Sequence, residues 1–210
     1  MNSRRRTFAP RQLAVYAMQF AIVGILVAGL LARNVSIVVN GVLALAVTFL
    51  PALVSHDWEV RPSPGVTLWI TLAVFLHAVG MLGLYDHVWW YDHVTHTLSA
   101  TIVAGVGYAT ARAIDRYTDA VYLPRRFMFV FIVTFTLAFG VFWEVLEFFV
   151  RLGADYFGAE AVLVQYGLED TIMDLLFDTV GAILVGLFGT RTLSSVVDSI
   201  HYRIEELRAG

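Results

Sequence analysis

Seven ionisable residues between positions 92 and 178 of this sequence fall into three groups at helical spacing. The groups are Asp92 with His96, Glu144 with Glu147, and Asp170 with Asp174 and Asp178. Residues three or four positions apart share one face of an α-helix, so each group presents its side chains to one neighbour. Carboxylates with one or two imidazoles suit Zn²⁺, Mn²⁺, Mg²⁺ or Ca²⁺, so the pattern favours a divalent metal cofactor.

If the three helix faces converge, their side chains form two layers in one pocket. The upper layer would hold Asp92, Glu147 and Asp174, and the lower layer His96, Glu144 and Asp178. So many carboxylates cannot all be ionised in a low-dielectric pocket unless protons or a cation neutralise some of them. A cation would polarise a phosphoryl or carbonyl oxygen or activate a water, with Glu147 or Asp92 as general base. The predicted metal ligands are His96, Glu144, Asp174 and Asp178.

Other polar residues in the same stretches have simpler explanations. Asp86, His87 and Asp170 lie near the ends of apolar runs, where solvated charges are ordinary. His77 lies inside an apolar run and is more typical of a packed or hydrogen-bonded histidine than of a ligand. Asn40 is a lone polar residue in another run and is typical of a hydrogen bond between helices. We therefore do not assign these residues to the predicted site.

Glu144, Asp174 and Asp178 lie deeper within apolar runs. An ionisable side chain in such a place costs at least ~2.5–3.5 kcal/mol on membrane insertion, so a functional role is favoured for all three. The alternative is a structural network in which protonated acids bond neighbouring helices together. Both interpretations require these acids to face other helices rather than lipid.

The elements that must position these residues are membrane-spanning helices. Hydrophobic residues make up 59% of the chain and charged residues 15%, against about 45–50% and ~25% in soluble domains. The excess falls into runs long enough to cross ~30 Å of hydrocarbon. We expect an all-α, polytopic membrane protein that forms one transmembrane domain over residues 1–210. Its expected spans are residues 13–31, 35–54, 66–85, 94–111, 127–150 and 171–189, followed by an amphipathic tail helix over 191–208.

The arginines predict the orientation. All 14 basic residues are arginine, and with six spans 12 of them fall on one side of the membrane. Only Arg33 and Arg151 fall on the other side. Positive residues favour the cytoplasmic side, so we expect both termini to be cytoplasmic and the protein to lie in the plasma (inner) membrane. The three acidic groups then share one depth near the outer surface.

Several function classes are excluded by composition and by missing motifs. The chain has no cysteine, which excludes disulfides, thiolate metal sites and cysteine nucleophiles. Its net charge is −3 and its arginines are dispersed, so a nucleic-acid partner has no support. Phosphate-binding, dinucleotide-binding, serine-hydrolase and zinc-protease motifs are missing from the sequence. The oligomeric state is left open.

The spacing of the polar residues resembles that of known membrane families. The residues that carry the likeness are Tyr91-Asp92-x-x-x-His96, Glu144-x-x-Glu147 and Asp170-x-x-x-Asp174 ahead of Gly181. They resemble the YjdF-like family of uncharacterised prokaryotic inner-membrane proteins and, distantly, the VanZ-like proteins. The likeness covers roughly residues 85–189. Thr97 and Ile172 stand where the first family tends to have an aromatic residue and a glutamine. The resemblance implies a membrane location and this residue set.

Three functions fit these observations. The first is a metal-dependent hydrolase or transferase that acts at the outer leaflet on a lipid or lipid-linked substrate, with membrane lipids as its other partners. The second is a proton- or cation-coupled transporter. The third is a non-catalytic membrane scaffold whose acids form a structural polar network. We expect the first, because the acidic groups are predicted to meet at one depth.

Overall fold

The structure is a computed structural model that describes residues 10–57, 60, 62–117, 121–163 and 166–209. The elements in these ranges are helices, and no strand occurs among them. The long helices are α1 (Pro10–Ala32), α2 (Val35–Asp57), α3 (Pro64–Val79), α5 (Tyr91–Tyr117), α6 (Arg125–Phe157), α7 (Leu168–Thr192) and α8 (Ser194–Ala209). A π-helical turn, η1 (Gly80–Leu84), and a short helix, α4 (Tyr85–His87), join α3 to α5.

The expected polytopic, all-α membrane protein is confirmed. Among the described residues, five helical segments are long and apolar enough to cross a membrane: α1, α2, α3 with its extension to His87, α6, and α7 as far as Gly189. The helix that contains the remaining predicted span, 94–111, is α5. Its 27 residues would reach about 40 Å at 1.5 Å per residue. It is less apolar because it carries Asp92, His93 and His96.

Local sequence explains where the helices begin and end. The Ser63 side chain accepts a hydrogen bond from the Val66 backbone N–H at 3.3 Å, which caps the start of α3. Helix α6 extends beyond the predicted span to Phe157, because no proline occurs in residues 151–157 and Gly153 keeps a helical backbone. Gly158 ends the helix with a left-handed φ of 64°. The segment predicted as a long loop from Arg151 therefore begins as two further helical turns.

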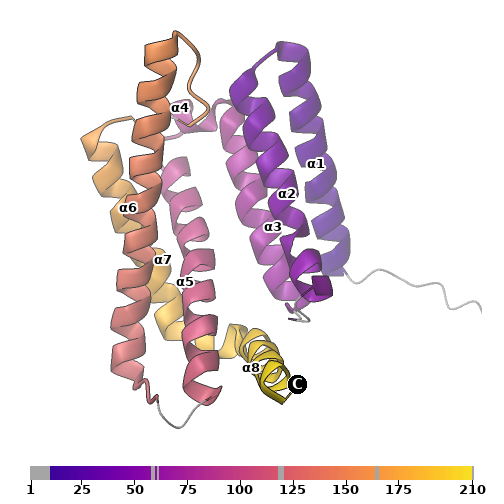
Figure 1. Ribbon diagram of the computed structural model, residues 1–210. Coiled ribbons are helices and arrows are strands. Elements are labelled where there is room, and N and C mark those ends of the chain that lie inside the picture. The colour runs from indigo at the N-terminus through magenta and orange to yellow at the C-terminus, as the bar shows by residue number, and fades with distance from the viewer. Residues whose placement is uncertain (1–9, 58–59, 61, 118–120, 164–165, 210) are drawn as a thin grey trace, which may run out of the picture.

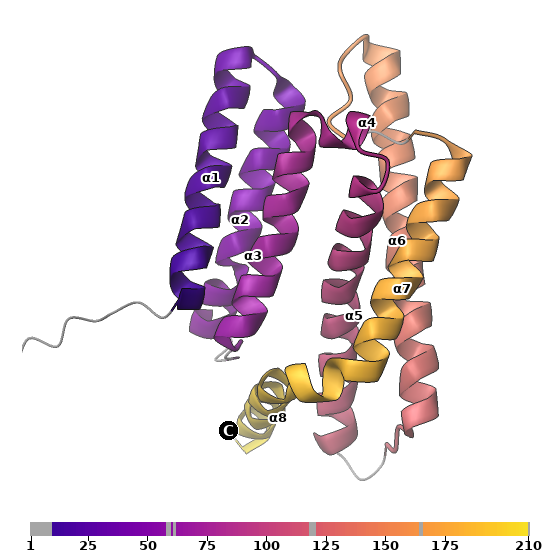
Figure 2. The ribbon, with the colours of Figure 1, turned by 180° about the vertical axis from the view of Figure 1, so that it is seen from behind.

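The helices form two groups that lie side by side (Figure 1). Helices α1, α2 and α3 pack together in one group, and α5, α6 and α7 pack in the other. Figure 2 shows that α3 and α5 face each other across the groups, and that α8 crosses beneath them. Each group has its own apolar core: Ile22, Ile25, Ala44 and Ala78 in the first, and residues such as Ala104, Ile132 and Ala182 in the second. The polar residues lie where the groups meet.

The predicted tail helix is confirmed as α8. Leu193 and Val197 are buried against the second core, whereas Tyr202 is 66% exposed. An ion pair of 2.5 Å between Arg116 and Asp198 joins α8 to the end of α5. These contacts hold one side of α8 against the bundle and leave its other side uncovered, which is the amphipathic pattern that the sequence predicted.

Glycines allow α5 and α7 to approach closely. A Cβ atom at Gly181 would lie 2.6 Å from the Thr97 carbonyl oxygen and 2.8 Å from the Ala100 Cβ. A Cβ atom at Gly107 would lie 2.6 Å from the Phe135 ring. Small residues are how membrane helices bring their backbones together. The close contact at Gly181 holds the two helices that carry the aspartates and His96 at a short separation.

We predict that Gly181→Ala destabilises the protein by about 1–3 kcal/mol, because the added methyl group has no space between α7 and α5. Thermal unfolding of the detergent-solubilised protein measures the effect. Gly24→Ala is the matched control, since no atom lies within 4 Å of a Cβ built on that α1 glycine. Equal unfolding temperatures for the two variants would show that the α5–α7 contact is not as tight as described.

Candidate functional site

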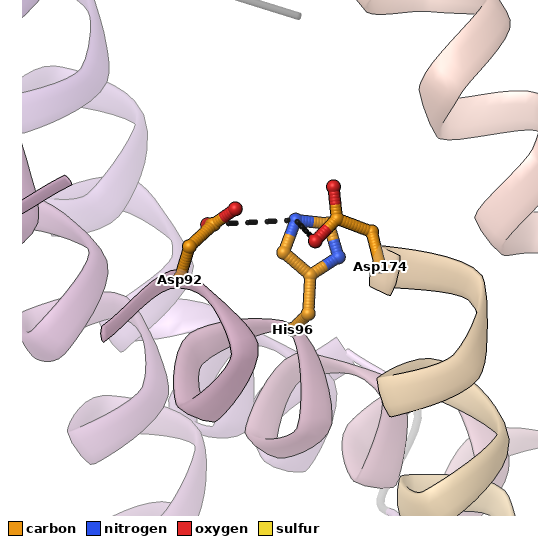
Figure 3. A group of neighbouring side chains, drawn as sticks. All are labelled: Asp92, His96 and Asp174. Carbon is orange, nitrogen blue, oxygen red and sulfur yellow. Dashed lines mark ion pairs between the residues drawn. The ribbon is translucent and has the colours of Figure 1, made fainter. Parts of the chain in front are cut away.

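Helices α5 and α7 place three carboxylates around the imidazole of His96, and Figure 3 shows two of them, Asp92 and Asp174. His96 Nε2 lies 3.7 Å from Asp92 Oδ1 on the preceding turn of α5. The same nitrogen lies 3.8 Å from Asp174 Oδ1, which comes from α7. The other ring nitrogen, Nδ1, lies 3.5 Å from Asp178 Oδ1. The predicted convergence of the groups on α5 and α7 is therefore seen in the structure.

Asp92, His96 and Asp174 form a group that fits one cation. Each offers a ligand atom, and the three atoms lie within 4.8 Å of one another. Ligands of one metal ion at about 2 Å lie roughly 3–4 Å apart, which matches the measured separations. The Asp174 side chain is 2% exposed, and its Oδ1 has no hydrogen-bond partner among the described residues. An unpaired buried carboxylate oxygen is costly, so this geometry calls for a cation or a proton.

Asp178 contacts His96, with which the sequence predicted it to share a layer, through the other ring nitrogen. It faces Nδ1 of His96, whereas the other two aspartates face Nε2. Metal-binding histidines commonly donate their second ring N–H to a carboxylate, which fixes the ring orientation. Gly140 on α6 leaves the space for this carboxylate, because a Cβ there would collide with Asp178 Oδ2. Asp178 is thus placed to orient His96 rather than to join its Nε2 group.

The glutamates of α6 lie beside this group but outside it. Glu144 is buried and accepts a hydrogen bond of 2.7 Å from Thr171 Oγ1. It is therefore level with the first turn of α7, and Gly140 occupies the level of Asp178 instead. The predicted layer that paired Glu144 with Asp178 is displaced by one helical turn. Glu147 accepts a hydrogen bond of 2.9 Å from Trp143 Nε1 and lines a cavity together with Asp92.

The first helix group supplies a hydrogen-bonded wall opposite these acids. Asn40 donates through Nδ2 to the Ser36 and Val162 carbonyl oxygens, so its Oδ1 must accept from His77 Nε2 at 3.2 Å. His77 then carries its proton on Nε2, and its Nδ1 accepts from the Tyr85 hydroxyl at 2.8 Å. The expectation that His77 and Asn40 are hydrogen-bonded between helices is confirmed.

Sequence reasoning missed Tyr85, which forms part of this wall. Its hydroxyl lies 3.5 Å from Thr95 Oγ1 on α5, so it reaches from the first helix group to the second. The Tyr85 ring packs over Gly80, where any Cβ would collide with it. In the sequence, the two glycines ahead of it in an apolar run indicate a bend, although they do not give the position of the tyrosine. Gly83, the second of them, has a φ of 108°, which bends the chain at this point.

A cavity of about 700 Å³ separates the two walls. This volume is in the range of small-molecule sites. Among the described residues, eight ionisable acids and histidines line it, and no arginine does so. They are Asp86, Asp92, Glu147, Asp170, Asp174, Asp178, His77 and His96. Most of the remaining lining is apolar. The cavity is strongly acidic, so an anionic ligand would be repelled unless a cation were bound first.

The segment between α6 and α7 covers one end of this cavity. The Val162 carbonyl oxygen accepts hydrogen bonds from Asn40 at 2.7 Å and from Ser36 Oγ at 3.2 Å. The Tyr166 hydroxyl donates to Asp86 Oδ1 at 2.9 Å. Burial, followed by the nearby Asp86, raises the pKa of Tyr166 to about 12, so the phenol keeps this proton at neutral pH. We call residues 162, 163 and 166 the cover.

Comparisons with known proteins agree with the membrane fold. The family described as "Predicted membrane protein (DUF2238)" matches residues 13–195. An uncharacterized protein of Thermotoga maritima is 29% identical over 117 residues, which span 54% of this chain and 56% of the relative. The match thus covers about half the length of that curated relative. No solved structure matches the chain. These findings support an uncharacterised membrane family, and the likeness to the YjdF-like and VanZ-like families stays a prediction.

We predict that Asn40→Ala destabilises the protein by about 1–3 kcal/mol, because it leaves His77 without its acceptor and removes a bond to the cover. Thermal unfolding in detergent measures this loss. Ser36→Ala is the matched control, because it removes only the other side-chain bond to the Val162 carbonyl. Its loss should be the smaller of the two. An equal loss would show that the His77 contact contributes nothing.

Proposed function

The chain belongs to the DUF2238 family of predicted membrane proteins, and we propose that it is a metal-dependent hydrolase or transferase for a lipid or lipid-linked substrate. One observation supports this most directly. Asp174 is almost fully buried, and its unpartnered Oδ1 faces the same nitrogen of His96 as Asp92 does. A divalent cation between these three side chains would pair that oxygen and offset the charge of two carboxylates.

The proposed ligands are Asp92, His96 and Asp174. The sequence-based ligand set was His96, Glu144, Asp174 and Asp178, with Glu147 or Asp92 as general base. The proposed set replaces Glu144 and Asp178 by Asp92, because Glu144 and Asp178 lie outside the group around Nε2. Asp178 would hold the imidazole in place through Nδ1. Oxygen and nitrogen ligands of this kind suit Zn²⁺, Mn²⁺ or Mg²⁺ and leave positions open for water and substrate.

Glu147 is the proposed general base. It lines the cavity beside Asp92 and is held by Trp143 rather than by a ligand residue. It would take a proton from the attacking water as the water oxygen bonds to a phosphoryl or carbonyl centre polarised by the cation. The bond to the leaving oxygen then breaks, and Glu147 returns the proton to that oxygen. The products are an acid and an alcohol.

Two alternatives have less support from the geometry. In a structural network, protonated acids would bond the helices together, yet Asp174 Oδ1 and Glu144 Oε1 have no partner among the described residues. A secondary transporter commonly binds its substrate where helices are broken. Helices α5, α6 and α7, which carry the acids, run unbroken past the site, and the break at Gly83 lies in the opposite wall of the cavity. A bound metal is therefore the first test of the proposal.

We predict that the purified protein contains about one equivalent of a divalent ion, and that Asp174→Asn and His96→Ala lose it. Elemental mass spectrometry after exposure to Zn²⁺, Mn²⁺ and Mg²⁺ provides the measurement. Asp178→Asn should keep the site but weaken metal affinity about 10–100-fold, because the imidazole loses its orienting carboxylate.

Glu144→Gln is the matched control for the metal experiment. Glu144 is as buried as the aspartates but binds Thr171 instead of facing His96. The variant should keep its metal. Loss of metal in this variant would support Glu144 as a metal ligand, as predicted from the sequence. If the wild-type protein binds none of the three ions, the proposal of a metal-dependent enzyme is wrong.

The proposed orientation places both termini in the cytoplasm and the metal site near the outer surface. The chain has no cysteine, so the labelling of a single introduced cysteine shows on which side of the membrane that residue lies. We predict that a membrane-impermeant maleimide labels Ala159→Cys in intact cells but labels Tyr122→Cys only after lysis. These residues are exposed at opposite ends of α6. The reverse labelling pattern would place the site near the cytoplasm.

A further inference from the structure

We propose that the cavity holds one apolar chain of a membrane lipid, which enters sideways between α2 and α6, with its polar head at the Asp92–His96–Asp174 group. This inference rests on the proposed function, because it assigns the substrate of the same site. It goes beyond that function by identifying the route of entry, the segment of lipid that is held and the residues that contact it.

The first support is that polarity changes in the same direction along three walls of the cavity. On α2 the lining runs from Val39 and Asn40 through Leu43 to Val47, about 10 Å beyond Asn40 along the helix. On α6 it runs from Glu147 through Phe142 and Phe139 to Thr136, about 16 Å away. The ionisable residue on α6 and the amide on α2 lie near the cover, and the lining beyond them is apolar except for the buried Thr136. A ligand that fills this cavity must itself be polar at one end and apolar at the other.

The α5 wall shows the same change. Its lining runs from Asp92 and His96 through Ala100 to Val103, about 16 Å from the first aspartate. The three helices are roughly aligned with one another (Figure 1). The long direction of the cavity therefore follows the helices across the membrane, which is also the direction of lipid chains in a bilayer. An apolar chain can move from the bilayer into the cavity without turning.

The second support is that several lining residues are also uncovered on the outside of the bundle. Leu43 on α2 is 56% exposed, and Phe139 and Phe142 on α6 are 50% and 63% exposed. In a membrane-spanning bundle, the surface they present lies in hydrocarbon. The lining of the cavity is thus continuous with the lipid-facing surface between α2 and α6. This continuity provides a sideways entrance.

The third support is that the cover bridges the polar end of the cavity. Asn40 and Ser36 bind Val162, and Asp86 binds Tyr166, so the cover is attached to both α2 and α4. A ligand that came from the water side would have to pass these residues, whereas the route between α2 and α6 is lined by apolar side chains such as Leu43 and Phe142. The apolar lining and the membrane-facing entrance both favour a lipid chain over a soluble substrate.

The test uses phosphatidylglycerol with a diazirine in one acyl chain, reconstituted with the metal-loaded full chain in lipid nanodiscs. After irradiation, mass spectrometry maps the labelled peptides. We expect labelling around Leu43 and Phe142 that unlabelled lipid suppresses. Labelling at Phe20, an 81% exposed residue of α1 outside the cavity, should not be suppressed. Labelling at all three positions that responds equally to unlabelled lipid would overturn the inference.

Two variants fill the apolar part of the cavity from opposite walls. Val47→Trp on α2 and Val103→Phe on α5 should each reduce the suppressible labelling about tenfold, because the added ring occupies the space of the chain. The matched control is Val27→Trp on α1, which is 47% exposed and does not line the cavity. The use of two walls keeps the test valid if one variant fails to fold.

Metal content separates this inference from the proposed function. The cavity-filling variants should keep their bound metal, because neither residue is near the ligand group. If the protein binds metal but unlabelled lipid does not suppress the labelling around Leu43 and Phe142, the inferred lipid route is wrong and the proposed metal enzyme is unaffected. Suppressible labelling in a protein that binds no metal would overturn the enzyme and support a lipid-binding cavity. Unchanged labelling in both filled variants would also contradict the inference.

Discussion

The burial of Asp174 beside His96 is the constraint on which the rest of the site depends. A carboxylate inside a membrane bundle needs a proton, a hydrogen-bond donor or a cation. Here its Oδ1 has an imidazole at 3.8 Å and no hydrogen-bond partner among the described residues. The structure therefore keeps an energetically costly carboxylate at the most extensive helix contact among the described residues, between α5 and α7. Its position between two close-packed helices keeps the carboxylate from turning away to water.

The surrounding features can be understood as supports for that arrangement. Gly181 brings the α7 backbone against α5, which fixes the distance between the aspartates and His96. Gly140 lets α6 approach closely enough to enclose Asp178. On the opposite side of the cavity, His77 donates a hydrogen bond to Asn40, so these two side chains form a neutral wall. The acidic wall alone carries unbalanced charge, and a cation would bind there.

Much of this could be predicted from the sequence because membrane helices obey simple rules. Length and apolarity identified the helices, and spacing predicted that Asp92 and His96 face Asp174 and Asp178 in two layers that also contain Glu147 and Glu144. The level of the two glutamates could not be predicted, because spacing along a helix does not give the register between helices. A shift of one turn puts Glu144 beside Thr171 and Gly140 beside Asp178. Tyr85 could not be placed because its position depends on the bend at Gly83.

The two halves of the cavity explain why a membrane protein would bury its acids at this depth. A metal site for soluble substrates would be expected to open to water, yet Val162 and Tyr166 bridge the polar end here through hydrogen bonds to Asn40 and Asp86. The apolar end is continuous with lipid-facing Leu43 and Phe142. A lipid can place its head at Asp92, His96 and Asp174 while its chain stays in an apolar environment. Only the polar head must then leave water. A cation held by the carboxylates would offset the desolvation cost of its phosphate or ester oxygens.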